Sequence, residues 1–239
     1  MKKKIFSFLL AICLIIPAMF TMSACNEEPP ADTNIYVSTE AQLKQAVSQS
    51  ADKSKIVLTG NIELTEQLTV LKELTIDLAG FTISNNTVDI WDDTDGVDTW
   101  SLISVQENGN LTIIGNGKLT AKMNDCYAVD VRDNAVVTIK NGTFNGNVSA
   151  VYVIGNATAN IDGGFFTIQQ LSSKNDYRFL LNAFDANNQD AKIIVKGGKF
   201  KEYDPSHSNS ENPQMNFVAE GYQSTEDEYG NYVVSKIAE

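Results

Sequence analysis

The stretch Val137-Thr138-Ile139-Lys140-Asn141-Gly142-Thr143-Phe144 carries the pattern that decides the fold: an alternating apolar strand, a glycine turn and then a large apolar residue. Further copies of this phrase occupy residues 111–119, 159–166 and 193–200. The last turn glycines of the four copies lie 25, 22 and 34 residues apart. Short strands that recur with a period in the twenties are typical of a stacked β-solenoid. The sequence therefore predicts an all-β protein built from repeats.

Each phrase follows another short apolar strand, at residues 101–105, 128–132, 150–154 and 181–185, so that one rung supplies three strands. The alternation of side chains assigns the inward positions. They form three columns: Val105, Val131, Val153 and Phe184; Ile113, Ile139, Ile161 and Val195; Leu119, Phe144, Phe166 and Phe200. Three columns fill a prism, which predicts three sheets and about six rungs. A β-sandwich is the alternative, because strands with turns every 8 to 12 residues also suit that fold.

The two ends of the repeat have distinct patterns. Thr39-Glu40-Ala41-Gln42 has the form of a capping box, and Leu43, Ala46 and Val47 form an apolar helical stripe. We expect a short helix here that covers the first rung, since a bare apolar end favours aggregation. Tyr222-Gln223-Ser224 and Tyr232-Val233-Val234 predict a hairpin that closes the last rung. The predicted domain spans residues 35–239.

With these features the chain resembles the right-handed parallel β-helix proteins of the pectate-lyase-like class, over about residues 35–235. It is most similar to small secreted β-helix proteins of gut bacteria and their phages, many of which have no assigned activity. The shared features are the capping helix, the entry phrase at 74–83, the Gly-Gly-x-Phe turns and an ending like that at 216–222. The resemblance implies a single-stranded right-handed parallel β-helix. It specifies a fold and not a chemistry.

The N-terminus has the pattern of an export signal. Lys2, Lys3 and Lys4 precede an apolar run that ends in Met22-Ser23-Ala24-Cys25, which resembles the bacterial lipobox. We therefore expect residues 1–24 to be a lipoprotein signal peptide, Cys25 to be lipidated and residues 25–34 to be a flexible tether. The alternative is a retained membrane span, because the run is nearly long enough for one. The expected location is the cell envelope, with the protein lipid-anchored to the membrane and extracytoplasmic or surface-exposed.

Charge and rare residues limit the function classes. The formal net charge is -12, and loss of residues 1–24 removes three lysines and no acid, which leaves -15. A field of that sign repels polyanions, so nucleic acid is excluded as an expected partner. Of three cysteines only Cys126 would remain as a thiol, which excludes an intramolecular disulfide. The single histidine, His207, lies in a polar loop, which argues against Cys/His or Ser/His/Asp catalysis.

One set of residues fits an enzyme. The resemblance implies that a lyase would use clustered acids with an arginine or lysine base, and that a glycosidase would use paired aspartates. Asp130 and Arg132 are expected to project outward from one strand, beside Tyr152 of the next rung and with Asp185 one rung further. Asp130, Arg132 and Asp185 are the candidate catalytic set if the protein is an enzyme. The alternative is a solvated acid–base pair on a sheet face.

A second set fits a binding site. Residues 85–100 interrupt the repeat and contain both tryptophans. The candidate ligand-binding residues are Trp91, Asp92, Asp93, Asp95, Trp100 and Tyr152. Tryptophan faces stack on sugar rings, and Asp92, Asp93 and Asp95 could collect Ca²⁺ through oxygen ligands, although their spacing does not match an EF-hand. Alternatively, Trp100 packs on the edge of the next rung, and the acidic residues keep an exposed loop soluble.

The sequence thus favours a non-catalytic β-helix lipoprotein that presents an adhesin-like surface to a glycan or protein ligand, without an obligatory cofactor. The alternative function is a polysaccharide lyase or glycoside hydrolase of the pectate-lyase-like class. The outer face separates the two hypotheses. A groove with converging acids and a base indicates chemistry, whereas a flat face with exposed aromatic residues indicates binding.

Overall fold

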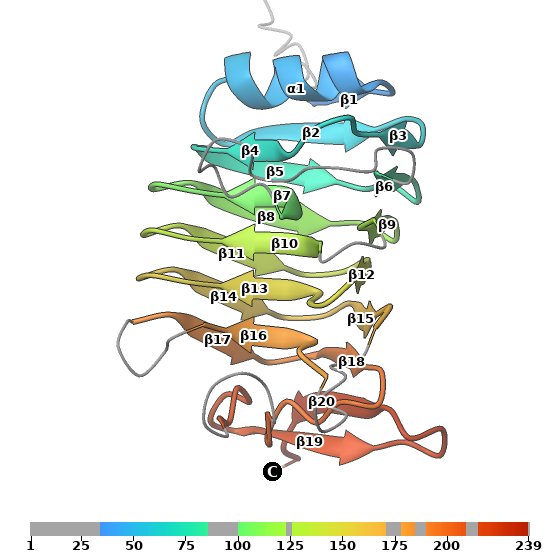
Figure 1. Ribbon diagram of the computed structural model, residues 1–239, viewed down its shortest axis with the longest axis vertical. Helices are drawn as coiled ribbons and strands as arrows, with labels where there is room; N and C mark the ends of the chain where they lie inside the picture. Colours follow the sequence, from blue (N-terminus) through green and yellow to red (C-terminus); the bar gives the residue numbers. More distant parts are fainter. Residues whose placement is uncertain are drawn as a thin grey trace, which may run out of the picture. The chain divides into compact units, whose positions relative to one another are not determined.

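The repeated phrases form short strands that stack into three sheets (Figure 1). The computed structural model describes residues 34–85, 100–122, 126–170, 178–184, 190–208 and 215–238. Residues 33–239 form one compact unit, to which the following description applies. Among the described residues, no helix has the length and apolar character needed to span a membrane.

Sheets A, B and C each receive one strand from every full rung. Sheet A contains, in spatial order, β1 (Ile35–Val37), β2 (Ser54–Leu58), β5 (Glu73–Asp77), β8 (Asn110–Ile114), β11 (Val136–Ile139), β14 (Thr158–Ile161) and β17 (Lys192–Val195). Sheet B contains β3 (Ile62–Glu63), β6 (Thr82–Ser84), β9 (Lys118–Thr120), β12 (Thr143–Gly146), β15 (Phe165–Ile168), β18 (Gly198–Phe200), β20 (Tyr232–Lys236) and β19 (Tyr222–Glu226). Sheet C contains β4 (Leu68–Val70), β7 (Ser101–Val105), β10 (Tyr127–Val131), β13 (Val151–Val153) and β16 (Leu181–Ala183).

Strand pairing within the three sheets is parallel except at the C-terminal hairpin. Consecutive strands such as β8, β9 and β10 lie in sheets A, B and C, and each pairs with the equivalent strands one rung earlier and one rung later. This topology is compatible with a parallel β-helix and confirms the prediction of an all-β fold with three mostly parallel sheets. It does not fit the β-sandwich alternative, whose sheets are antiparallel.

Two of the three predicted inward columns are confirmed. In sheet A, Ile139 pairs with Ile113 and Ile161, and Ile161 pairs with Val195. In sheet B, Leu119, Phe144, Phe166 and Phe200 are in register and fully buried. The Phe144, Phe166 and Phe200 rings stack at 5.1 and 5.0 Å between centroids. These columns form the core between the sheets.

The column in sheet C has one error. Val105, Val131 and Val153 are in register as predicted, but Val153 pairs with Ala183 and not with Phe184. Phe184 therefore follows the strand on the outward side, and its ring lies 6.1 Å from that of Tyr152. A shift of one residue moves a side chain to the opposite face, because the period of a strand is two.

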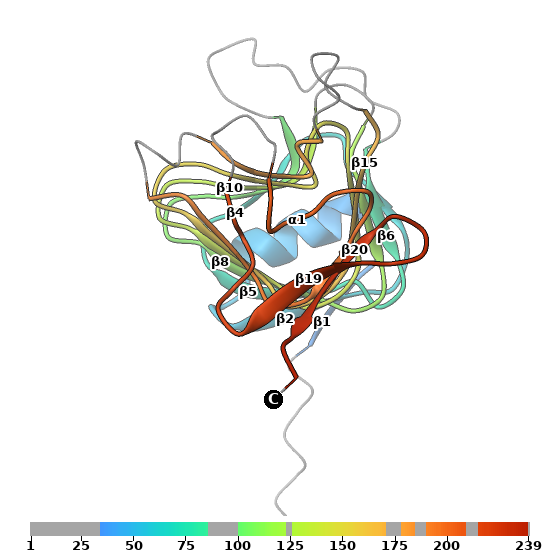
Figure 2. The same ribbon diagram turned by 90° about the horizontal axis from the view of Figure 1, so that it is seen from below.

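The helix α1 (Glu40–Gln49) covers the first rung, as Figure 2 shows along the stack. The Thr39 hydroxyl accepts the Gln42 backbone N–H, and the Gln42 side chain accepts the backbone N–H of Ser38, one residue before the cap. Leu43, Ala46 and Val47 are the buried residues of the helix, as the stripe predicted. At the other end, the Lys72 ammonium donates to the carbonyls of Ser48 and Ser50, at 2.8 and 3.0 Å. A cation there complements the negative end of the helix dipole.

The turns between sheets A and B are stacked glycines. Gly142, Gly164 and Gly198 have φ values of +109°, +105° and +107°; the first two directly precede β12 and β15, and Gly198 is the first residue of β18. Such φ values strain any residue with a Cβ, which explains the recurrence of glycine at this point of the phrase. At the C-terminus β19 and β20 form the predicted hairpin, in which β20 pairs antiparallel with β18.

Candidate binding face on sheet C

The outer face of sheet C differs from the outer faces of sheets A and B in its burial. On sheet A the outward residues Thr75, Thr112, Thr138 and Asn160 are partly exposed. On sheet C the residues Ser104, Asp130, Tyr152 and Asn182 are in register with one another and are at most 8% exposed. Polar groups are normally buried only where they have bonding partners. This face is therefore the part of the fold that most needs a chemical explanation.

Three ranks of residues, which we call the outer face of sheet C, run across the strands. The middle rank is Thr69, Ser104, Asp130, Tyr152 and Asn182. The rank before it is Gln67 with four fully buried residues that belong to the core, Leu102, Ala128, Ala150 and Leu180, and the rank after it is Leu71, Gln106, Arg132, Ile154 and Phe184. The last rank repeats one backbone bond: the N–H groups of Gln106, Arg132, Ile154 and Phe184 donate to the carbonyls of Val70, Val105, Val131 and Val153.

Asp130 and Arg132 form the charged centre of this face. The Asp130 carboxylate is fully buried, and its Oδ2 lies 2.7 Å from Nη2 of Arg132. The same Oδ2 accepts the hydroxyl of Ser104 at 3.1 Å, and the Gln106 amide donates to that hydroxyl oxygen at 2.9 Å. The Arg132 side chain remains 18% exposed. Part of the Arg132 side chain thus reaches the surface, while the carboxylate of Asp130 lies below.

Aromatic side chains lie beside this pair. The Tyr127 and Tyr152 rings stack with centroids 4.5 Å apart and an angle of 8° between their planes. Phe184 continues the row on the other side of Tyr152 with a tilt of 30°. Tyr127 and Phe184 are partly exposed, whereas Tyr152 is nearly buried between them. A row of aromatic faces beside polar groups is the combination that binds sugar rings.

The predicted site residues are brought together only in part. Asp130, Arg132 and Tyr152 share the face as predicted. Asp185 lies outside the described residues, and the place predicted for it, in the rank of Arg132 and Ile154, belongs to Phe184. Trp91, Asp92, Asp93 and Asp95 also lie outside the described residues. Where the structure describes the chain, no group of three acidic, histidine or cysteine side chains could hold a metal ion.

Trp100 and Asn85 border the segment that contains Trp91. The Trp100 carbonyl accepts the backbone N–H of Tyr127 at 2.7 Å. Asn85 is fully buried, and its side-chain amide lies 3.9 Å from the Cys126 sulfur, one residue before Tyr127. Asn85 and Trp100 therefore both contact the beginning of β10, next to the aromatic row.

Two nucleophile candidates do not form catalytic sites. Burial raises the pKa of the Cys126 thiol to about 11, which makes it a poor nucleophile. Asp204, Ser206 and His207 form a cluster within one loop, where Nδ1 of His207 faces both the Ser206 hydroxyl, at 2.8 Å, and Asp204 Oδ2, at 3.2 Å. A serine triad needs the two partners on different ring nitrogens, so that one nitrogen accepts the serine proton while the other is held by the acid. The cluster is a loop-stabilising arrangement.

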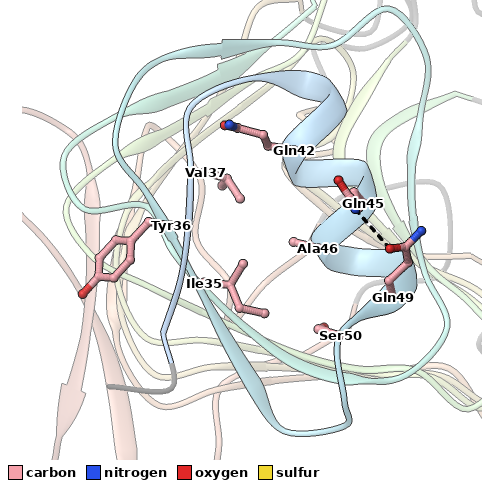
Figure 3. Close-up of a pocket in the computed structure, with 8 residues that line it drawn as sticks. All are labelled: Ile35, Tyr36, Val37, Gln42, Gln45, Ala46, Gln49 and Ser50. Atoms are coloured by element: carbon pink, nitrogen blue, oxygen red, sulfur yellow. Dashed lines mark hydrogen bonds between the residues drawn. The ribbon is translucent and has the colours of Figure 1, made fainter. Parts of the chain in front are cut away.

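A hollow of about 350 Å³ lies between β1 and α1 (Figure 3). Ile35, Val37 and Ala46 point into it, while Tyr36 points away and is 55% exposed. The polar part of the lining consists of Gln42, Gln45, Gln49 and Ser50. Gln42 is engaged in the cap of the helix, and Gln45 donates to Gln49 at 3.1 Å. No charged side chain lines the hollow, which lies at the interface between the capping helix and the first rung.

The sequence pattern did not identify Ser104, Asn182 or Tyr127 as parts of a site. Serine and asparagine at outward strand positions look like ordinary solvent-facing residues. Tyr127 could have been recognised from the sequence, because it begins the strand that also contains Asp130. No protein-family model, curated protein or solved structure matches this chain.

Proposed function

We propose that this protein is a non-catalytic, lipid-anchored β-helix of the cell envelope that binds a glycan through the outer face of sheet C. The observation that carries the proposal is the partly exposed aromatic row, Tyr127 and Phe184 around Tyr152, beside the buried polar residues Ser104, Asp130 and Asn182. Aromatic faces supply apolar contact for sugar rings, and the partly exposed Gln106 and Arg132, which the buried Ser104 and Asp130 hold in place, supply hydrogen bonds for sugar hydroxyls. The outer faces of sheets A and B also hold aromatic residues, Tyr36 and Phe165, but their outward threonines and lysines are exposed or partly exposed and not buried.

The proposed scaffold is a single-stranded right-handed parallel β-helix. Its support is the rung topology, in which parallel strands recur in the order of sheets A, B and C, together with the right-handedness usual for parallel crossover connections. The stacked glycine turns and the inward phenylalanines fix the rungs in register. A rigid sheet face is suited to hold binding residues at constant spacing.

The proposed location depends on residues 1–34. The basic residues, the apolar run and Met22-Ser23-Ala24-Cys25 support export and lipidation of Cys25. A lipid anchor with a polar tether would hold the domain at an extracytoplasmic surface, where glycans are available. Calcium bound by Asp92, Asp93 and Asp95 is part of the proposal as an aid to glycan contact, and is therefore a variable of the experiment.

Cleavage of a polysaccharide is the second candidate function, and one observation favours it. Asp130 and Arg132 place an acid and a base 2.7 Å apart on the proposed face. Against it, both groups are engaged with each other, and no second carboxylate lies in the three ranks of the outer face. Glycosidase chemistry uses two carboxyl groups about 5 to 10 Å apart. Binding is therefore the function that the geometry supports better.

The test is a glycan array probed with the purified protein, with and without Ca²⁺. Each bound glycan is then incubated with the protein and analysed for new reducing ends and for unsaturated products. Binding without new products is the expected result. New products would replace binding by cleavage as the function. Silence on every glycan, together with capture of a defined surface protein, would replace the glycan by a protein ligand.

A further inference from the structure

Two charged residues of the outer face of sheet C, Asp130 and Arg132, form an ion pair. Among the fifteen residues of its three ranks, only Asp130 and Arg132 are charged. The two side chains differ in depth, since Asp130 is fully buried whereas Arg132 is partly exposed. A ligand lying on the aromatic row would thus meet the Arg132 side chain first. The carboxylate would act on that ligand only through Arg132.

The ion pair with Asp130 determines how much net positive charge Arg132 presents to a ligand. An arginine at the surface of a site normally binds the carboxylate or sulfate of a ligand in a fork of two hydrogen bonds. Here Nη2 of Arg132 already donates to Asp130, which is held in turn by the Ser104 hydroxyl. Because the carboxylate lies in a buried environment, its field is screened less than that of a surface acid. The pair is neutral as a unit, and an acidic sugar gains little at this place.

We infer that Asp130 is a specificity-determining residue, which holds Arg132 and thereby makes the face select uncharged sugars over uronates and sulfated sugars. This inference rests on the proposed glycan binding and adds the class of ligand. Two facts support it beyond the ion pair. The net charge of -12 repels acidic glycans at long range, and no further cation lies in the three ranks. Asp130 acts here as a positioning residue, since it reaches the ligand through Arg132.

The experiment compares glycans that differ only in charge. Methyl-esterified and de-esterified oligogalacturonides are one such pair, and an array supplies others, such as unsulfated and sulfated forms of one oligosaccharide. The variant Asp130→Asn keeps the size of the side chain but removes its charge. We expect the ratio of acidic to neutral binding to rise about tenfold, because Arg132 becomes available for a charge-assisted bond. The double variant D130N/R132Q should return the ratio to that of the wild type.

Asp77→Asn is the matched control. Asp77 Oδ2 lies 2.9 Å from the Lys55 ammonium on sheet A, so this change also removes one negative charge and releases one cation. It should leave the ratio unchanged. A second readout needs no ligand: phenylglyoxal labels arginines, and the chain has two, Arg132 and Arg178. Labelling of Arg132 should increase several-fold in D130N, while labelling of Arg178, which pairs with Glu202, stays constant.

The outcomes separate the two proposals. A wild type that prefers acidic glycans, or a D130N ratio equal to that of the wild type, overturns the specificity and leaves glycan binding standing. Absence of all glycan binding overturns the proposed function and the specificity with it. If D130N does not fold, wild-type binding decides. Affinity for acidic sugars that falls strongly between about 0.05 and 0.5 M salt shows an available guanidinium and overturns the inference, whereas weak binding that salt does not reduce supports it.

Discussion

Tyr127 and Tyr152 stack in parallel across neighbouring strands of sheet C, with 4.5 Å between their ring centroids. The two rings differ in exposure, because Tyr152 is only 8% exposed and Tyr127 is partly exposed. Tyr152 thus supports the ring of Tyr127 from one side. This arrangement holds an aromatic face at a fixed position, which lowers the entropy cost of binding a sugar.

The first prediction concerns Tyr127. Tyr127→Ala removes the supported ring, and glycan affinity should fall about five- to tenfold, the usual worth of one aromatic contact. The control is Tyr36→Ala, which removes an exposed aromatic ring from the edge of sheet A. Isothermal titration with a glycan found on the array measures both. Equal losses for the two variants would place the binding site elsewhere.

The second prediction concerns the aromatic column of the core. Phe166 is fully buried between Phe144 and Phe200, so Phe166→Ala should lower the free energy of unfolding by about 3 to 5 kcal/mol. Its neighbour Phe165 faces outward and is partly exposed. Phe165→Ala should cost less than about 1 kcal/mol. Urea denaturation measures the free energy of unfolding of both variants. A similar loss for both would contradict the assignment of Phe166 inward and Phe165 outward.

The success of the sequence prediction for the four repeated phrases has a physical reason. Each phrase combines a strict alternation of inward and outward residues with a turn glycine, whose position fits only one path of the backbone. Two independent signals therefore fix the register. The segment around Phe184 has neither signal. Leu180, Leu181, Ala183 and Phe184 place apolar residues on both faces, and alternation cannot then assign the inward side. The one-residue error in this strand follows from that ambiguity.

The candidate site was less predictable than the fold. Asp130 and Arg132 could be recognised because they are charged and lie two residues apart on a strand. The depth of these two side chains could not be predicted from the sequence. The burial of an outward residue depends on chain segments that pack over the strand and not on the alternation within the strand. For the same reason Ser104 and Asn182 gave no signal, although both are almost fully buried.

The third prediction concerns acid stability. Burial would raise the pKa of Glu40, but bonds from Lys44 and Thr65 outweigh this effect and lower it below its ordinary 4.5. A lowered pKa stabilises the folded state above the unfolded-state pKa, and the stabilisation is lost as the pH falls through the folded-state value. Glu40→Gln should therefore lower the melting temperature by roughly 2 °C at neutral pH.

The pH dependence provides the control for Glu40. The difference between Glu40→Gln and the wild type should stay constant down to about pH 4.5 and then decline, and it should vanish once the pH is below the folded-state pKa, where Glu40 is protonated in both the folded and unfolded wild type. Glu63→Gln changes an exposed carboxyl on β3 and should have little effect at any pH. Melting curves by circular dichroism measure both variants. A Glu40→Gln difference that grows in acid would show that the ion pair does not act as described.

The fourth prediction separates steric overlap from backbone strain. A Cβ on Gly146 would lie 1.7 Å from the carbonyl oxygen of Ser149, so Gly146→Ala must displace the backbone that leads into β13. We expect a loss of at least about 3 kcal/mol or failure to fold. Gly80 has a φ of +89° but open space around it, and Gly80→Ala should cost only about 1 to 2 kcal/mol. Soluble yield and urea denaturation rank the variants, and the reverse order would contradict the close approach at Gly146.

The fifth prediction uses the cysteines to test the core and the anchor together. With a pKa of about 11, roughly one Cys126 thiol in a thousand is ionised at pH 8, and burial also blocks access to it. The folded protein from membranes should therefore not react with a thiol reagent such as dithionitrobenzoate.

After denaturation we expect one thiol per chain, because lipidation of Cys25 and removal of Cys13 with the signal leave only Cys126. Cys126→Ser should abolish that signal, and Cys25→Ala should release the protein from membranes without changing it. Three thiols per denatured chain would instead show that residues 1–24 are retained and that Cys25 carries no lipid.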